Sequence, residues 1–120
     1  MPLPFWRRGE INAAQYLRSQ GYRIVVSGYR VKEGEVDLVA WDGEVLVFVE
    51  VKSRRSADLP EAAVGHTKQR RVIRAARAYI ALHKLHDRTF RFDIVAVNES
   101  EAEAPSYRLL RDAFRPHSSA

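Results

Sequence analysis

The segment that most constrains the fold runs from Gly34 to Arg54, because two apolar, valine-rich runs flank a strong turn signal. Glu35–Trp41 and Val45–Lys52 contain the β-branched and aromatic residues that favour strands. The dipeptide Asp42-Gly43 between them is typical of a hairpin turn. The segment therefore predicts two antiparallel strands whose side chains alternate between two faces.

One face of this predicted hairpin collects charged side chains. Glu35 and Asp37 share a face of the first strand, and Glu50 and Lys52 share a face of the second. If the turn dipeptide alone forms the loop, Glu35 lies opposite Glu50, and Asp37 is a diagonal neighbour of Glu50. If the loop has four residues, Asp37 lies directly opposite Glu50. Both registers bring the four charged groups together.

Three carboxylates beside one ammonium group repel each other, and burial adds to that cost unless a cation compensates. Oxygen ligands favour Mg²⁺ or Mn²⁺, and such a site suits metal-assisted phosphodiester hydrolysis, with Lys52 stabilising a phosphate or positioning water. A solvent-facing surface with incidental charges is the alternative. The same face, however, carries large apolar residues that argue against full solvation: Val39, Trp41, Leu46 and Phe48.

Helical periodicity and strand alternation elsewhere give an order of elements. Helices are expected over Arg7–Gln20 and Thr67–His86, and further strands over Tyr22–Val31 and Arg91–Val97. The pattern does not show whether the terminal element Tyr107–Phe114 is a helix or a strand. The order α, β, β, β, α, β predicts an α/β fold with a mixed central sheet flanked by helices.

Length and composition fit one domain over residues 1–120, with a flexible tail at 116–120. The absence of cysteine excludes disulfides, cysteine-bound zinc, iron–sulfur clusters and thiol catalysis. The longest run of aliphatic and aromatic residues, Val45–Val49, is far too short to span a bilayer. Because the N-terminus does not resemble a signal peptide either, we expect a cytoplasmic protein without membrane partners.

Basic residues are concentrated after the third strand. Lys and Arg number 20 against 15 Asp and Glu, and the stretch from Lys52 to Arg77 holds eight basic and two acidic residues. This excess favours nucleic acid as a partner, with a solvated arginine-rich helix face as the alternative. Phosphate contacts here would give salt-sensitive affinity without sequence reading. The candidate contacts are Arg54, Arg55, Lys68, Arg70, Arg71 and Arg74.

An Asp on one strand followed by Glu50-Val51-Lys52 on the next resembles the PD-(D/E)XK nuclease superfamily, although Val36 replaces the usual proline before Asp37. The chain is more specifically similar, over nearly its whole length, to the YraN-type family of uncharacterised bacterial proteins. Matching stretches include Gly9-Glu10, Tyr16-Leu17, Gly21-Tyr22, Gly34–Val39, Phe48–Arg54, Lys68–Arg71, Arg91–Val95 and Asp112–Phe114.

The resemblance implies a restriction-endonuclease-like fold, similar to that of archaeal Holliday-junction resolvases. It implies that Asp37 and Glu50 are the main metal ligands, joined by the Val51 carbonyl and by Glu10 from the first helix. It makes Lys52 the catalytic lysine.

Three further residues take more distant roles in the same resemblance. Lys68 and Gln69, which open the second main helix, are placed to reach the site or the phosphate, and Glu35 has a secondary role. A resolvase-like activity would also require a symmetric homodimer, because two phosphodiesters must be cut symmetrically.

The leading hypothesis from the sequence is therefore an Mg²⁺- or Mn²⁺-dependent endonuclease acting on DNA, with branched or junction DNA as a candidate substrate. A non-catalytic nucleic-acid-binding or assembly protein on a nuclease-like scaffold is the first alternative, since a fold does not establish an activity. A protein-interaction module that uses the same basic surface is the second.

Overall fold

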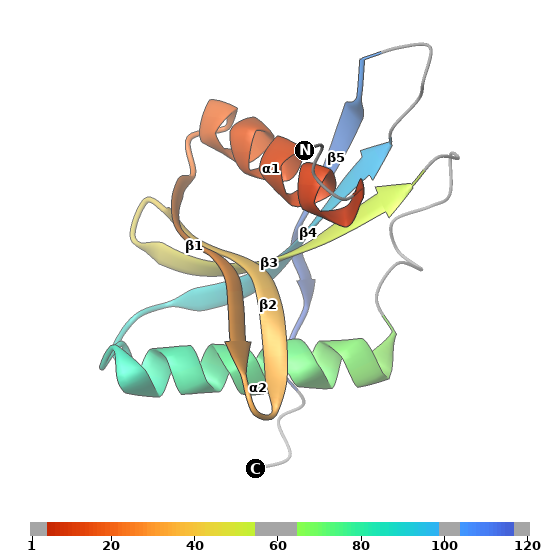
Figure 1. Ribbon diagram of the computed structural model, residues 1–120. Helices are drawn as coiled ribbons and strands as arrows, with labels where there is room; N and C mark the ends of the chain where they lie inside the picture. The colour runs from red at the N-terminus through yellow and green to blue at the C-terminus, as the bar shows by residue number, and fades with distance from the viewer. Residues whose placement is uncertain (1–4, 55–64, 99–103, 117–120) are drawn as a thin grey trace.

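The computed structural model describes residues 5–54, 65–98 and 104–116, without the side chains of residues 5–8 and 54 (Figure 1). Its elements in chain order are α1 (Phe5–Ser19), β1 (Arg23–Val31), β2 (Gly34–Asp42), β3 (Val45–Arg54), α2 (His66–Leu82), β4 (Phe90–Asn98) and β5 (Ser106–Phe114). The order α, β, β, β, α, β expected from the sequence is confirmed, with one more strand at its end.

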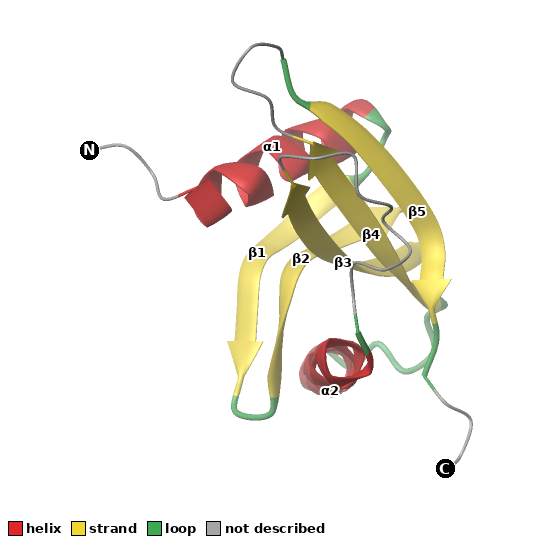
Figure 2. Cartoon of the chain, turned by 90° about the vertical axis from the view of Figure 1, so that its right-hand side faces the viewer, coloured by secondary structure: helices red, strands yellow, loops and turns green. Residues whose placement is uncertain are grey.

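The five strands form one mixed sheet in the order β1-β2-β3-β4-β5. β3 and β4 run parallel, whereas the other three neighbouring pairs are antiparallel. A parallel pair needs a long crossover, and α2 lies within the connection between these two strands. Figure 2 shows α1 and α2 on opposite faces of the sheet, as a restriction-endonuclease-like fold requires.

Each helix covers its own apolar core. On the α2 side, Phe48 and Phe92 of the sheet pack with Val72 and neighbouring residues of the helix. On the α1 side, Leu17 packs with Val47 and other small strand residues. Because β3 is buried on both faces, its sequence is a continuous apolar run rather than a polar–apolar alternation.

The hairpin between β2 and β3 has the register that brings Asp37 opposite Glu50. Asp42 pairs with Val45, so the loop is Gly43 and Glu44 rather than Asp42 and Gly43. Gly43 has φ +60°, and a glycine with positive φ at the first loop position is what a type II′ turn requires. The proposed two-residue loop was therefore wrong by one position, and the alternative pairing is the one observed.

Two other boundaries differ from expectation. α2 ends at Leu82, four residues before the predicted end, because Lys84 takes φ +55° and Leu85 N–H donates to the Ile80 carbonyl in a closing turn. The untyped C-terminal element is the edge strand β5, whose pairing with β4 shifts beside Asp112, a non-glycine residue with φ +53°. That shift breaks the alternation by which a strand is recognised.

Among the residues that the structure describes, neither helix has the length and apolar character needed to cross a membrane. Arg55 and residues 117–120 of the predicted tail lie outside the described ranges.

Candidate active site

Two carboxylates, the buried Glu50 and the half-buried Asp37, close a gap where β2 and β3 stop pairing regularly. The regular ladder between these strands ends at Leu38 opposite Val49. One residue further, the Asp37 N–H donates to Glu50 Oε1 at 3.3 Å, and the Val51 N–H donates to Asp37 Oδ2 at 2.8 Å. Side-chain oxygens thus take over from backbone carbonyls as acceptors, and each bond links a backbone N–H of one strand to a carboxylate of the other.

A kink shared by β1 and β2 directs Asp37 toward this gap. Gly28 has φ +73° and lies opposite Asp37, since the residues on either side of both are paired. Val36 and Val39 both pack in the α2-side core although they are three residues apart. Strict alternation would place them on opposite faces, so β2 rotates between them. Asp37 is the polar residue at the start of that rotation.

Burial controls the charge of this pair. Glu50 is 2% exposed, and burial raises its pKa to about 8, with repulsion from Asp37 adding to the effect and Lys68 opposing it. Burial also raises the pKa of Asp37, against the lowering effects of the Val51 N–H and of Lys68. Both shifts run in the direction that disfavours charge, so the chain supplies too little positive charge to offset the burial of two ionised carboxyl groups.

Lys68, in the first turn of α2, is the cation that faces these carboxylates. Its Nζ lies 3.4 Å from Glu50 Oε2 and 3.8 Å from Glu35 Oε1. Burial opposes its charge, but the carboxylates of Glu50, Asp37 and Glu35 raise the pKa of Lys68 on balance. Arg30 contacts Glu35 at 3.3 Å from the other side. Lys68 thus bridges the buried Glu50 and the more exposed Glu35.

A close backbone contact fixes α2 against the start of β2. A Cβ atom on Gly34 would lie 1.9 Å from the Arg71 carbonyl oxygen, so only glycine allows this approach. Gly34 immediately precedes Glu35, and Arg71 lies one turn of helix after Lys68. The contact therefore sets the distance between the ammonium and the acidic residues.

Lys52 has a different environment from the one its motif suggests. Strand alternation puts it on the same face as Glu50, and it is half-buried. Within residues 5–54, 65–98 and 104–116, the Lys52 side chain forms no hydrogen bond or ion pair. Lys68, rather than Lys52, contacts the carboxylates. The catalytic role of Lys52 remains a prediction.

The predicted third and fourth metal ligands are less closely gathered. Glu10 is half-buried in α1, next to Gly9, whose added Cβ would lie 2.1 Å from Ser53 Oγ in β3. This places the N-terminal half of α1 against the end of β3 that follows Lys52. In the described part of the chain, no three His, Cys, Asp or Glu side chains are grouped closely enough to hold a metal. Glu10 and the Val51 carbonyl thus remain predicted ligands.

The donor set nevertheless fits a divalent cation. Asp37 and Glu50 are adjacent oxygen donors, and the raised pKa values of both show that added positive charge would be favourable there. Mg²⁺ commonly takes only one or two protein carboxylates and keeps several waters. A complete cage of protein ligands is therefore not required.

The predicted nucleic-acid contacts divide into two groups. Arg70, Arg71 and Arg74 are exposed on α2, and Gln69 is half-buried beside Lys68. The Arg54 side chain and all of Arg55 lie outside the described residues. The helix that carries Lys68 thus also presents an exposed row of arginines, beginning two residues after it.

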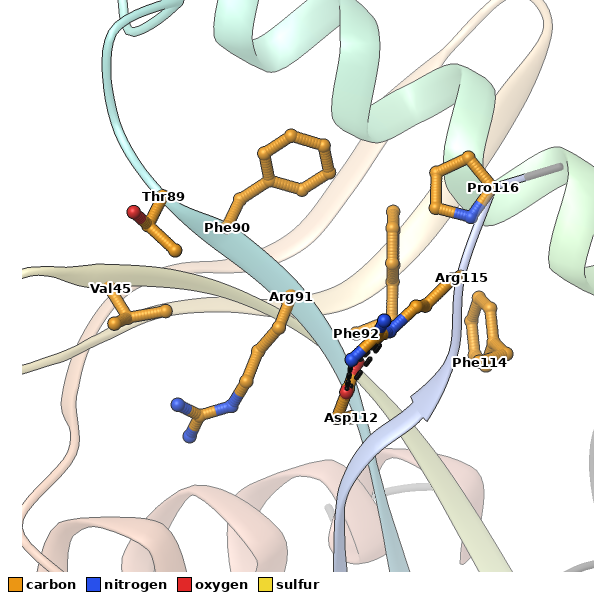
Figure 3. Close-up of a pocket in the computed structure, with 9 residues that line it drawn as sticks. All are labelled: Val45, Thr89, Phe90, Arg91, Phe92, Asp112, Phe114, Arg115 and Pro116. Carbon is orange, nitrogen blue, oxygen red and sulfur yellow. Dashed lines mark hydrogen bonds and ion pairs between the residues drawn. The ribbon is translucent and has the colours of Figure 1, made fainter. Parts of the chain in front are cut away.

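A cavity of about 440 Å³ lies at the opposite end of β3 and β4 from Glu50. Figure 3 shows Phe90, Phe92 and Phe114 around it, with Arg115 paired to Asp112. The cavity contains none of the predicted site residues. It is distinct from the carboxylate pair.

Sequence reasoning missed a second polar cluster, centred on Asp93, which is fully buried in β4. Tyr22, Arg91 and the Asp112 N–H donate to its carboxylate. An Asp among Phe, Ile and Val residues of a buried strand was the available signal, because such a carboxylate needs partners.

A mixed sheet between two helices, with Asp37 on one strand and Glu50-Val51-Lys52 on the next, defines a PD-(D/E)XK-like protein. A model of the uncharacterised protein family UPF0102 matches residues 9–97, and the chain belongs to this family. The YraN-type resemblance seen in the sequence is thereby confirmed.

Individual relatives agree over most of the chain. A UPF0102 protein of Syntrophus aciditrophicus is 45% identical over 108 residues, covering 88% of this chain and 84% of that protein. One from Trichlorobacter lovleyi is 43% identical over 109 residues, with 88% and 86% covered. One from Anaeromyxobacter dehalogenans is 48% identical over 99 residues, with 81% and 74% covered. Their names carry a family and no activity.

Proposed function

We propose that this protein is a metal-dependent endonuclease that hydrolyses phosphodiester bonds of DNA. The observation that carries the proposal is the pair Asp37 and Glu50, in which each strand's backbone donates to the other strand's carboxylate and burial raises the pKa of both groups. Carboxyl groups whose pKa values are raised by burial and by a neighbouring carboxylate are typical of functional sites, including those that bind a cation. A water- or phosphate-bound Mg²⁺ or Mn²⁺ fits their oxygen donors.

The site residues have two proposed roles, metal binding and contact with the attacking water or the phosphate. Asp37 and Glu50 would hold the metal, with the Val51 carbonyl and Glu10 as further ligands. When bound, such a metal lowers the pKa of a coordinated water and polarises the phosphoryl oxygen. Lys52, on the same face as Glu50, would orient the attacking water or stabilise charge on the phosphate.

The charge distribution supports a nucleic-acid substrate. Arg70, Arg71 and Arg74 lie on the helix whose first turn brings Lys68 to Glu50. Contacts from this row to phosphates would hold a duplex beside the carboxylates without reading its sequence. The likeness to junction resolvases favours branched DNA as the substrate and a symmetric homodimer as the active form.

The test is a cleavage assay with Mg²⁺ or Mn²⁺ on labelled four-way junction, flap, duplex and single-stranded DNA. The parent chain is compared with Glu50→Gln, which removes the charge but keeps the shape, and with Lys52→Met. Glu44→Gln in the exposed loop after β2 is the matched control. We expect metal-dependent cutting by the parent and the control only. Equal cutting by all four proteins would indicate a contaminating nuclease and would remove the support for the proposal.

One observation favours a second candidate, a nucleic-acid-binding protein without catalysis. Lys68 forms an ion pair with Glu50 and offsets part of the acidic charge, so the site can persist without metal. Salt-sensitive DNA binding that is lost in an Arg70→Ala, Arg74→Ala double variant, with no cutting in any metal, would select this alternative. Absence of nucleic-acid binding at low salt would instead favour a protein-interaction module.

A further inference from the structure

We propose that Lys68 is a tethered second cation of the candidate active site, which limits how tightly a divalent metal binds and presents positive charge to the substrate phosphate. This inference rests on the proposed nuclease function. It assigns to an α2 residue the charge that a second metal ion supplies in two-metal hydrolases.

The two oxygens of Glu50 face different partners. Oε1 accepts the Asp37 N–H, whereas Oε2 faces Lys68 Nζ at 3.4 Å. The ammonium is therefore on the α2 side of Glu50, and Asp37 is on the β2 side. The Glu50 carboxylate can therefore face two cations, one at each oxygen. The Lys68 ammonium already lies at one of these two positions.

The position of the ammonium is built into the fold rather than left to a mobile surface chain. Lys68 is anchored in the first turn of α2, whose approach to β2 is fixed by the Gly34 contact with the Arg71 carbonyl. Its ammonium also contacts Glu35, which Arg30 contacts in turn. Four residues from three elements thus define this place for positive charge.

The exposure of the two partners suggests the direction in which Lys68 acts. The Glu50 side chain is 3% exposed, whereas that of Lys68 is 41% exposed. An incoming phosphate can therefore reach the ammonium without displacing the buried carboxylate. Lys68 would contact a phosphate oxygen while it still offsets the charge of Glu50.

Electrostatics makes two opposite predictions for removal of this charge. An ammonium about 4 Å from a carboxylate repels a divalent ion held by the same carboxylate, so its loss should strengthen metal binding. The loss also favours a proton on Glu50, but a divalent ion carries twice the charge of a proton and gains more. Cleavage should nevertheless fall, because the substrate phosphate loses a cationic partner.

The experiment titrates the full-length protein with Mn²⁺ and measures free Mn²⁺ by electron paramagnetic resonance at fixed pH and ionic strength. Lys68→Gln should bind Mn²⁺ about tenfold more tightly than the parent and cut DNA about a hundredfold more slowly. Lys68→Arg keeps the charge and should bind Mn²⁺ like the parent. Lys84→Asn removes an exposed lysine whose positive φ suits asparagine, and should change neither quantity.

The outcomes separate this inference from the proposed function. Tighter Mn²⁺ binding with slower cutting in Lys68→Gln supports the inference. Unchanged or weaker binding in that variant overturns it, and a parallel fall in binding, cutting and thermal stability would assign Lys68 a purely structural part. If the parent chain neither binds Mn²⁺ nor cuts, the nuclease proposal itself fails, and this inference fails with it.

Discussion

Asp93 and the Asp37–Glu50 pair are two buried acidic sites in one sheet, and their partners differ. The Asp93 carboxylate accepts the Tyr22 hydroxyl at 2.8 Å, Arg91 Nε at 3.0 Å and the Asp112 N–H at 2.9 Å. One carboxylate thus has a guanidinium, a phenol and a backbone donor. All three partners belong to the chain: Arg91 lies on β4 with Asp93, Asp112 lies on the neighbouring β5, and Tyr22 immediately precedes β1.

The Asp37–Glu50 pair has the same number of donor groups, three, for twice as many carboxylates. Its short contacts are two backbone N–H groups and the Lys68 ammonium, and the pKa of Glu50 rises to about 8. Both acidic sites lie at irregularities of the sheet, where a side chain accepts a bond from a neighbouring backbone. The difference in charge compensation therefore distinguishes Asp93 from the Asp37–Glu50 pair, for which we propose an external cation.

The largest effect is expected from a substitution that disrupts the Asp93 cluster. Asp93→Asn removes the charge that Arg91 and Tyr22 surround, and leaves the half-buried guanidinium with Asp42 as its remaining carboxylate partner. We expect unfolding free energy to fall by about 3–5 kcal/mol, measured by urea denaturation. Asp87→Asn at an exposed position is the control and should cost little. A loss below about 1 kcal/mol in Asp93→Asn would show that the cluster is not held by this charge.

The next prediction tests whether the Asp37–Glu50 pair opposes folding when ionised. Because the folded-state pKa of Glu50 is raised, its stabilising contribution is complete below its unfolded pKa, ordinarily 4.5, and is lost as pH rises toward about 8. Without metal, the parent should lose roughly 2–4 kcal/mol of stability across that range. Glu50→Gln should remove most of this pH dependence.

Metal addition sharpens the same test. Mn²⁺ should restore stability to the parent at high pH, because it replaces the proton that Glu50 has lost, and should do less for Glu50→Gln. Thermal unfolding across pH, with and without Mn²⁺, measures both effects. An identical pH profile for the parent and Glu50→Gln would show that Glu50 is not the group that titrates.

The strand pattern predicted the acidic pair, whereas Lys68 was placed near the site only by the family resemblance. Period-two alternation and the hairpin signal were enough to bring Asp37, Glu50 and Lys52 to one face, because strand geometry fixes which side chains can meet. The loop position was wrong by one residue, since the positive φ at Gly43 selects the turn. The contact with Lys68 depends on how α2 docks, and no local pattern encodes that distance.

The fold was predicted in a similar way, with success where periodicity was regular. Strongly patterned segments such as α1 and β3 were located to within a few residues. β5 could not be typed because the shift beside Asp112 interrupts its alternation, and the Asp93 cluster could not be assembled because Tyr22 is 71 residues away. Long-range partners of this kind come from tertiary packing alone.

A smaller effect is expected where backbone packing brings Lys68 to the carboxylates. Gly34→Ala places a Cβ 1.9 Å from the Arg71 carbonyl oxygen, so β2 or α2 must shift. We expect a stability loss of about 1–3 kcal/mol and slower cleavage, because Lys68 moves relative to Glu50. Gly65→Ala is the matched control, since a Cβ there meets nothing within 4 Å. Equal behaviour of the two variants would show that the close contact does not position the helix.

The smallest expected effect measures how much the Tyr22 hydroxyl contributes to the stability of the Asp93 cluster. Tyr22→Phe deletes the hydroxyl that donates to Asp93 and accepts from Arg91 and Arg111, but it keeps the ring in the α1-side core. Because the Arg91 and Asp112 donors remain on Asp93, we expect a loss of only about 1–2 kcal/mol in urea denaturation. A loss as large as that of Asp93→Asn would mean that the phenol, rather than the guanidinium, makes burial of this charge tolerable. A small loss keeps charge compensation as the property that distinguishes Asp93 from the Asp37–Glu50 pair.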